Sequence, residues 1–398
     1  MRVILDSSVV TEASSAPTSN GERTGHFRKN VRASMACLPA WMQPSLTYVT
    51  GKPLPHQKPM LILHPVLHTV FATVGFLAMA GAEMTLLHIH PGLGIVLLAP
   101  YWIAMTGYVR RFQVVYAHHA SHLALSRSRM INRVLSDILT TIPLIQNGYD
   151  YKRDHLSHHK RRDFSTRRDF AAMFLLKAGF RPSAPTKESW RTFWKAVISP
   201  KFHFGFFYER LRSNLLAPSL YRILMALIWI LFLAFICFLV GGWVFVLCVV
   251  VPIGPLYQVS TLLNTITEHG WLGSEDGPAN MEEYAARCWA RFCGEPCPNP
   301  GSVGFRKWYL WSRWWIRSIL IHIPTRIAVF VGDTPAHDWH HLAGYQHDTL
   351  AWPYAIYQRE AAITEGKGSG LDEREVWGLW DTIDHSFCYL SRIPVATE

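Results

Sequence analysis

Four long apolar stretches, arranged in two pairs, dominate the chain. They cover residues of about 61–87, 93–109, 221–240 and 243–263. Within each pair only a short turn intervenes. An apolar helix of about 20 residues is long enough to cross the hydrocarbon core of a bilayer. The pattern therefore predicts an all-α membrane protein with two transmembrane helical hairpins, which makes four spans.

The segments outside the hairpins are polar, and they divide the chain into three parts. We expect an N-terminal tail over 1–58, a main domain over 59–345 that contains both hairpins, and a C-terminal segment over 346–398. Aromatic and basic residues are mixed in 163–216 and in 305–323, which predicts helices that lie on the membrane surface. The first residues lack the apolar run of a signal peptide, so the internal spans would direct insertion.

The distribution of lysine and arginine predicts the orientation in the membrane. These residues number 7 in 1–58, 20 in 109–218 and 11 in 263–398, whereas the turns at 88–92 and 241–242 contain none. Segments rich in lysine and arginine remain on the cytoplasmic side of a membrane. We therefore expect both termini, and a helical cap formed by the polar sections, to be cytoplasmic.

Composition narrows the possible partners and metal sites. The net charge of +11 could indicate a nucleic-acid partner, but the basic residues flank apolar spans, so a bilayer explains them and no nucleic acid is expected. Of seven scattered cysteines, Cys288, Cys293 and Cys297 form C-x4-C-x3-C, one ligand short of the usual structural zinc site. We predict neither a cysteine metal site nor a disulfide framework.

Three histidine boxes in the polar sections carry the candidate chemistry. The first is H-x-x-x-H, and the other two share the pattern H-x-x-H-H. On a helix, residues three and four apart share one face, so each box directs its imidazoles the same way. With 20 histidines in 398 residues, one H-x-x-H-H arises by chance with a probability of about 0.05 per chain. Neutral imidazole is a good ligand for iron, zinc, copper or nickel. The box residues are His118 and His122, then His155, His158 and His159, then His337, His340 and His341.

A ninth candidate ligand is His269, which follows the fourth span directly and on the same predicted side as the boxes. Nine imidazoles exceed the needs of one octahedral ion, but they suit two ions with four or five each. The chain contains no E-x-x-H motif, which distinguishes the site from the carboxylate-rich ferritin-like centres. His119 lies on a neighbouring helical face and is left out of the ligand set.

Carboxylates beside the boxes are candidates for a supporting role. Metal-bound histidines usually donate their second N–H to a carboxylate or a carbonyl. Four acids adjoin the predicted ligands, and we expect them to orient those imidazoles: Asp154, Glu268, Asp338 and Asp348.

Three histidine boxes around two membrane hairpins make residues 60–345 resemble the membrane fatty acid desaturase superfamily, which also holds hydroxylases and carotenoid ketolases. The resemblance implies that the eight box histidines and His269 bind two non-haem irons. His269 is similar to the lone histidine after the last span of acyl-CoA desaturases. There an asparagine four residues earlier contributes through water, and the candidate here, Asn264, precedes His269 by five.

The resemblance also implies an activity. The enzyme would use O2 to introduce a double bond into an acyl or lipid-like chain, with electrons from a separate donor such as a ferredoxin or cytochrome b5 with its reductase. A hydroxylase or ketolase with the same site is the alternative. A metal transporter or b-type cytochrome is a non-enzymatic alternative, but it requires histidines inside the spans, whereas the boxes lie beyond them.

Overall fold

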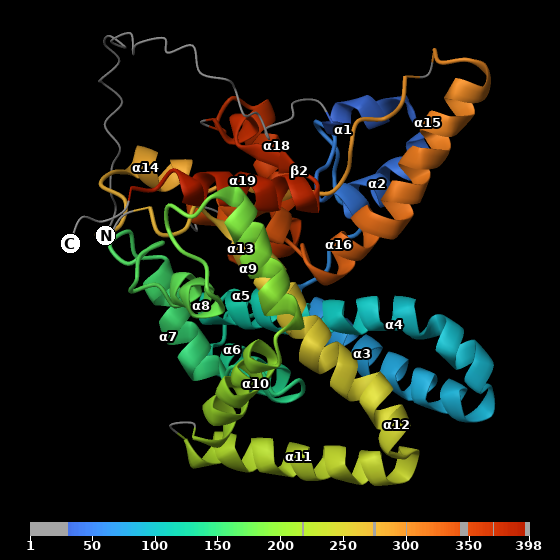
Figure 1. Cartoon of the computed structure of the whole chain (residues 1–398), viewed down its shortest axis with the longest axis vertical. Coiled ribbons are helices and arrows are strands. Elements are labelled where there is room, and N and C mark those ends of the chain that lie inside the picture. Colours follow the sequence, from blue (N-terminus) through green and yellow to red (C-terminus); the bar gives the residue numbers. More distant parts are fainter. Residues whose placement is uncertain are drawn as a thin grey trace.

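The computed structural model describes residues 31–216, 219–273, 276–299, 301–342, 349–368 and 370–394, and the regular secondary structure of this part is almost entirely helical (Figure 1). Two three-residue strands, β1 (Ala290–Phe292) and β2 (Glu375–Trp377), pair in parallel. The helices of the hairpins are α3 (Pro65–Ile89), α4 (Pro91–Arg111), α5 (His118–Ser121), α11 (Leu220–Val240), α12 (Gly242–Phe245) and α13 (Tyr257–Glu268).

The remaining α-helices form the polar part of the molecule. They are α1 (Val31–Ser34), α2 (Gln43–Thr50), α6 (Arg129–Thr141), α7 (Gly148–His158), α8 (Phe170–Ala178), α9 (Thr186–Ile198), α10 (Pro200–Leu215), α14 (Met281–Ala286), α15 (Gly304–Arg317), α16 (Ile323–Ala328), α17 (His337–Leu342), α18 (Ala355–Thr364) and α19 (Leu379–Ser391). Four wider, π-helical segments are η3 (Phe112–Ala117), η4 (Val246–Val250), η5 (Pro252–Leu256) and η6 (Ser318–His322).

In the described part of the chain, four helices are long and apolar enough to cross a membrane, which confirms the predicted pair of hairpins. The second and fourth are longer than their apolar runs, because they continue as helix over Pro91–Ser121 and Gly242–Glu268. At about 1.5 Å per residue, the 31 residues of the second span extend roughly 46 Å. The hydrocarbon core is only about 30 Å thick. The ends of these two helices therefore carry polar residues, including histidines, out of the apolar layer.

The two hairpins are joined by hydrogen bonds between side chains and backbone. Tyr101 Oη donates to the Cys248 carbonyl over 2.6 Å, and Trp102 Nε1 donates to that of Leu247 over 2.7 Å. Helix α11 stands apart from the other spans in Figure 1, and side chains such as Leu231 and Phe238 on it are exposed. Such a helix needs lipid around it, because an exposed apolar surface of this size is unfavourable in water.

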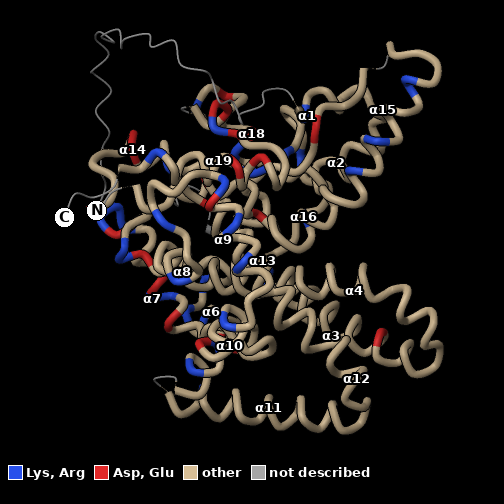
Figure 2. Tube along the Cα trace, in the orientation of Figure 1, with Lys and Arg blue, Asp and Glu red and all other residues tan. Residues whose placement is uncertain are grey.

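The polar helices gather at one end of the hairpins, away from both turns. Figure 2 shows lysine, arginine, aspartate and glutamate concentrated there, with few charges along α3, α4 and α11. Within the predicted tail, α1 and α2 pack on this part, since Val31 and Leu46 share a buried cluster with Phe292 of β1 and Trp377 of β2. Residues 1–30 lie outside the described part of the chain.

A buried ion-pair network holds the third histidine box against this core. Arg359 of α18 is 1 % exposed and bonds both carboxylate oxygens of Asp338 on α17, at 2.9–3.1 Å. The same guanidinium bonds Glu375 of β2 at 2.8 Å, and Lys52 approaches Glu375 from the N-terminal segment. Helix α17 is thus connected to segments from both ends of the chain.

Candidate metal centre

Five histidines converge on one point and form what we call the five-histidine group. Their potential ligand atoms all lie within 4.8 Å of one another. The Nε2 atoms face each other directly, as in the pairs His122–His155 at 2.7 Å and His118–His340 at 2.9 Å. Since all three boxes contribute, the group joins helices that are distant in sequence: His118, His122, His155, His159 and His340.

The other four predicted ligands form a second cluster, the four-histidine group, which consists of His158, His269, His337 and His341. Here too the potential ligand atoms lie within 4.8 Å of one another, and the Nε2 atoms of His337 and His341 are 3.0 Å apart. All four residues are buried. The structure therefore brings together all nine predicted histidines, divided five and four.

The two H-x-x-H-H boxes each divide their histidines in the same way. The first and last members of a box, such as His155 and His159, enter one group, and the middle member, such as His158, enters the other. Residues four apart on a helix are separated by only 40°, while neighbours diverge by 100°. The groups adjoin where the rings of His159 and His341 stack at 4.3 Å.

Local irregularities position the first box and His269. The π-helical segment η3 directly precedes His118, and π-helical turns are frequent at functional sites because they rotate the following residues. His269 follows the end of α13 in an extended conformation and forms an isolated antiparallel bridge with Cys288. Its backbone is therefore held independently of its ring.

Two outer contacts were not predicted from the sequence. His158 Nδ1 lies 2.7 Å from Asp169 Oδ2, and Asp169 is fully buried while also capping α8 through the Ala171 amide. His341 Nδ1 lies 2.7 Å from Tyr284 Oη. Both contacts leave Nε2 directed at the group. The available signal for Asp169 was its position before the helical run that begins at Phe170, but that pattern identifies a cap and not a histidine partner.

The acids predicted to support the imidazoles have different surroundings. Glu268 Oε1 lies 3.2 Å from His337 Nε2, so it faces the four-histidine group itself. Asp154 bonds Gln146 and Arg153, and Asp338 is bound by Arg359. Asp348 lies outside the described residues.

The predicted asparagine and the excluded histidine also have identifiable partners. Asn264 accepts hydrogen bonds from Arg291 through its backbone carbonyl, at 3.0 Å, and its side-chain oxygen, at 3.4 Å. His119 Nε2 lies 2.8 Å from Asp333 Oδ2, and the His119 ring stacks on Trp352 at 4.2 Å. His119 belongs to neither histidine group.

The environment favours neutral imidazoles. Burial, reinforced by the neighbouring histidines, holds the pKa values of His155, His159, His340 and His341 well below their usual range. Burial also lowers the pKa of His122 to about 3. At His158 burial opposes the charged form, but the carboxylate of Asp169 raises the pKa of this ring above its usual value. Neutral rings have the free lone pair that metal coordination needs.

His269 provides the clearest evidence that a metal ion fits. Both of its ring nitrogens are buried, and neither has a hydrogen-bond partner in the part of the chain that the structure describes. An unsatisfied buried polar atom costs roughly 1–3 kcal/mol. A metal ion in the four-histidine group would bind one of these nitrogens. Sets of four and five imidazoles suit iron, zinc, copper or nickel.

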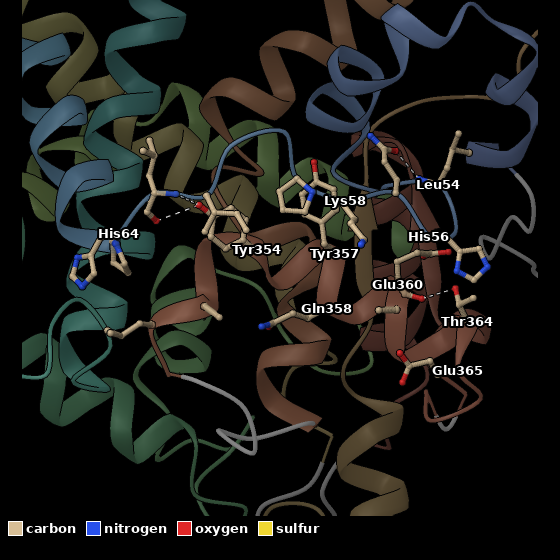
Figure 3. Close-up of a pocket in the computed structure, with 18 residues that line it drawn as sticks. Leu54, His56, Lys58, His64, Tyr354, Tyr357, Gln358, Glu360, Thr364 and Glu365 are labelled. Atoms are coloured by element: carbon tan, nitrogen blue, oxygen red, sulfur yellow. Dashed lines mark hydrogen bonds between the residues drawn. The ribbon is translucent and has the colours of Figure 1, made fainter.

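A cavity of about 730 Å³ lies apart from both groups, between residues 54–65 and α18. Apolar residues such as Ile62 and Leu350 line it. In Figure 3, His56, Glu360 and Glu365 gather at one end of this cavity, while His64 and Tyr354 lie at the other. None of the nine converging histidines lines it.

Comparison with known protein families identifies one match. The family model for fatty acid desaturase matches residues 91–297. This range contains the first two boxes and His269, whereas the third box lies beyond it. The position of the third box in the site therefore rests on the structure. The search of curated proteins finds no match.

Proposed function

Because the chain belongs to the fatty acid desaturase family, we propose that it is a membrane-bound, O2-dependent di-iron enzyme that introduces a double bond into an acyl or lipid-like chain. The observation that carries the proposal is the convergence of nine imidazoles into groups of five and four. Two irons held there would supply the oxidising power that an unactivated C–H bond requires. The metal ions would carry out the chemistry. The residues of the protein would hold these ions, orient their ligands and exclude water.

The roles of individual residues follow from their contacts. If Nε2 of His158 bound the metal, Nδ1 would carry the hydrogen and donate it to Asp169, which would keep the ring in one orientation. His341 has the same arrangement with Tyr284. Phe164 and Trp271 pack against the rings of His158 and His269, and they exclude water from that side of the site.

A lipid-like substrate fits the surroundings of the site. The cavity of about 730 Å³ is lined in part by Pro65, the first residue of α3. Its walls are largely apolar, with charged residues at one end, as an amphiphile requires. Trp352 directly follows Ala351, which lines this cavity. The ring of Trp352 stacks on that of His119, the neighbour of the proposed ligand His118.

The proposed function is tested by expressing the protein in a host of known lipid composition and comparing the extracted products by mass. A desaturase yields products that lack two hydrogens, and His158→Ala is expected to yield none. A product that gains one oxygen would instead establish the hydroxylase or ketolase activity.

Metal analysis after iron-replete expression is expected to find two irons per chain. One metal per chain, or none, in active protein would contradict the di-iron proposal.

Asp169→Asn tests the outer contact of His158. The substitution replaces the carboxylate acceptor with an amide of the same shape, and loss of such a partner typically lowers activity or metal affinity 10–100-fold. We expect turnover to fall within that range, together with weaker retention of iron during dialysis against a chelator. Asp154→Asn is the matched control, because Asp154 bonds Arg153 and Gln146. Equal effects of the two substitutions would contradict the assigned role of Asp169.

The orientation of the site is the remaining part of the proposal. We place both termini and the nine histidines on the cytoplasmic side, because lysine and arginine are concentrated in the polar sections and absent from both turns. A reporter fused after Glu398 is expected inside the cell, and one inserted between Gly241 and Gly242 outside. A reporter after Glu398 that appears outside would overturn this topology.

A further inference from the structure

The segment that follows the second histidine box is strongly basic and exposed. We call residues 160–168 the basic loop. Its only acid, Asp163, is half-buried and bonds Ser157. Of the cations, Arg168 pairs with Asp163 and Asp276, while the other four form no ion pair within the described ranges. The exposed cations are Lys160, Arg161, Arg162, Arg167 and Arg168.

The inner side of the basic loop is buried and fixed to the protein. Phe164, Ser165 and Thr166 are fully buried. Ser165 Oγ donates to the Gly270 carbonyl over 2.5 Å, and the Leu272 amide donates to the Ser165 carbonyl over 2.8 Å. The backbone that carries the cations is therefore fixed at several points. In an unstructured charged segment the backbone would be free to move.

Phe164 connects the basic loop to the metal centre. Its ring centroid lies 4.8 Å from that of His269, 5.2 Å from that of His158 and 5.4 Å from that of His341. Phe164, which lies two residues after Arg162, is thus in contact with three of the four histidines of the four-histidine group. The basic loop therefore offers a short path from solvent to the metal centre.

The basic loop faces away from the hairpin turns. In Figure 1, the turns α3–α4 and α11–α12 lie at the right of the view, and the α7–α8 connection lies at the left. Figure 2 shows lysine and arginine beside α7 on that left side. In the proposed topology this is the cytoplasmic side, where a soluble protein has access to the loop.

The reaction itself requires such a partner. Reduction of O2 to two waters consumes four electrons and four protons, and removal of two hydrogens from a substrate supplies only two of each. Two further electrons and two protons must therefore enter per turnover. Resting on the proposed function, we propose that an acidic one-electron carrier protein docks on the basic loop and delivers these electrons singly beside Phe164. Charge complementarity of this kind accelerates encounter and sets the docking position.

The test measures binding of an oxidised, strongly acidic [2Fe–2S] ferredoxin to the full chain in nanodiscs of neutral lipid. Arg161→Glu/Arg162→Glu/Arg167→Glu reverses three loop charges. Lys187→Glu/Arg191→Glu/Lys195→Glu makes the same charge change on the exposed face of α9 and is the matched control. We expect the loop variant to raise Kd at least about tenfold at low salt, since exposed charges are screened over roughly 10 Å at 0.1 M. The control is expected to stay near wild type, and loop-variant turnover driven by dithionite to remain unchanged.

Each other result has a definite meaning. Equal weakening by both triple variants, or by neither, would overturn the proposed docking position. A loop variant that binds ferredoxin normally but loses binding to phosphatidylserine vesicles would show that the loop contacts lipid, which also overturns it. Wild-type protein that binds ferredoxin through the loop but forms no product with any reductant would support the docking surface and contradict the proposed enzymatic function.

Discussion

His269→Ala is expected to abolish turnover and to reduce the iron content from two to at most one per chain, while the protein still inserts and accumulates. The ring of His269 is 1 % exposed, lies 4.5 Å from that of His341, and has no hydrogen-bond partner for either nitrogen in the described chain. Loss of a direct ligand is more severe than loss of an outer partner, which costs about 10–100-fold. The backbone bridge to Cys288 does not involve the ring, so the local fold is expected to remain. Activity and metal content of purified protein measure both effects.

Two substitutions serve as controls for His269→Ala. His119→Ala removes a buried imidazole that belongs to neither histidine group and bonds Asp333. Glu268→Gln changes the neighbouring carboxylate while keeping its shape. Both are expected to retain measurable activity. If His269→Ala is close to wild type while His119→Ala is inactive, the ligand assignment is wrong, and the first box supplies three ligands.

Arg359→Met is expected to destabilise the protein by about 3–5 kcal/mol, since it leaves the buried charges of Asp338 and Glu375 without their shared cation. Asp338 is fully buried and lies between the ligands His337 and His340. We therefore expect a lower thermal midpoint in detergent together with loss of metal, because α17 is no longer held in place.

The double variant Arg359→Met/Asp338→Asn distinguishes the ion pair from simple packing. Removing the uncompensated carboxylate is expected to restore part of the lost stability, which appears as a coupling term in a double-mutant cycle. Arg306→Met, at an exposed arginine of α15, is expected to melt like wild type. Equal midpoints for Arg359→Met and wild type would show that the network contributes little to stability.

The hairpins and the convergence of the boxes were predictable because both depend on local spacing. Apolar length predicts a span, and the interval of three or four residues places His155 and His159 on one face. How the nine histidines divide was not predictable, because the position of His158 in the other group depends on how α7 faces α13 and α17. The extension of the second span through η3 was also missed, since apolar length ends near Val109 while the helix continues into the polar part of the molecule.

Outer contacts were the least predictable part of the site. Proximity in sequence suggested Asp338 as a histidine partner, but its carboxylate is bound by Arg359, 21 residues further along the chain. Asp169, which does contact His158, lies 11 residues away across a turn. Contacts of this kind follow from the packing of α7, α8, α17 and α18, which no single segment encodes.

The division of each H-x-x-H-H box between both groups has a consequence for how the centre assembles. An ion in the five-histidine group would fix His155, His159 and His340, and because each box is one short helix it would also fix His158, His337 and His341 for the second ion. The ordering of α7 and α17 would therefore be shared by the two binding events, and we expect these events to be positively cooperative. Chains with a single ion are then a minor species, and a chelator that removes one ion weakens the hold on the other.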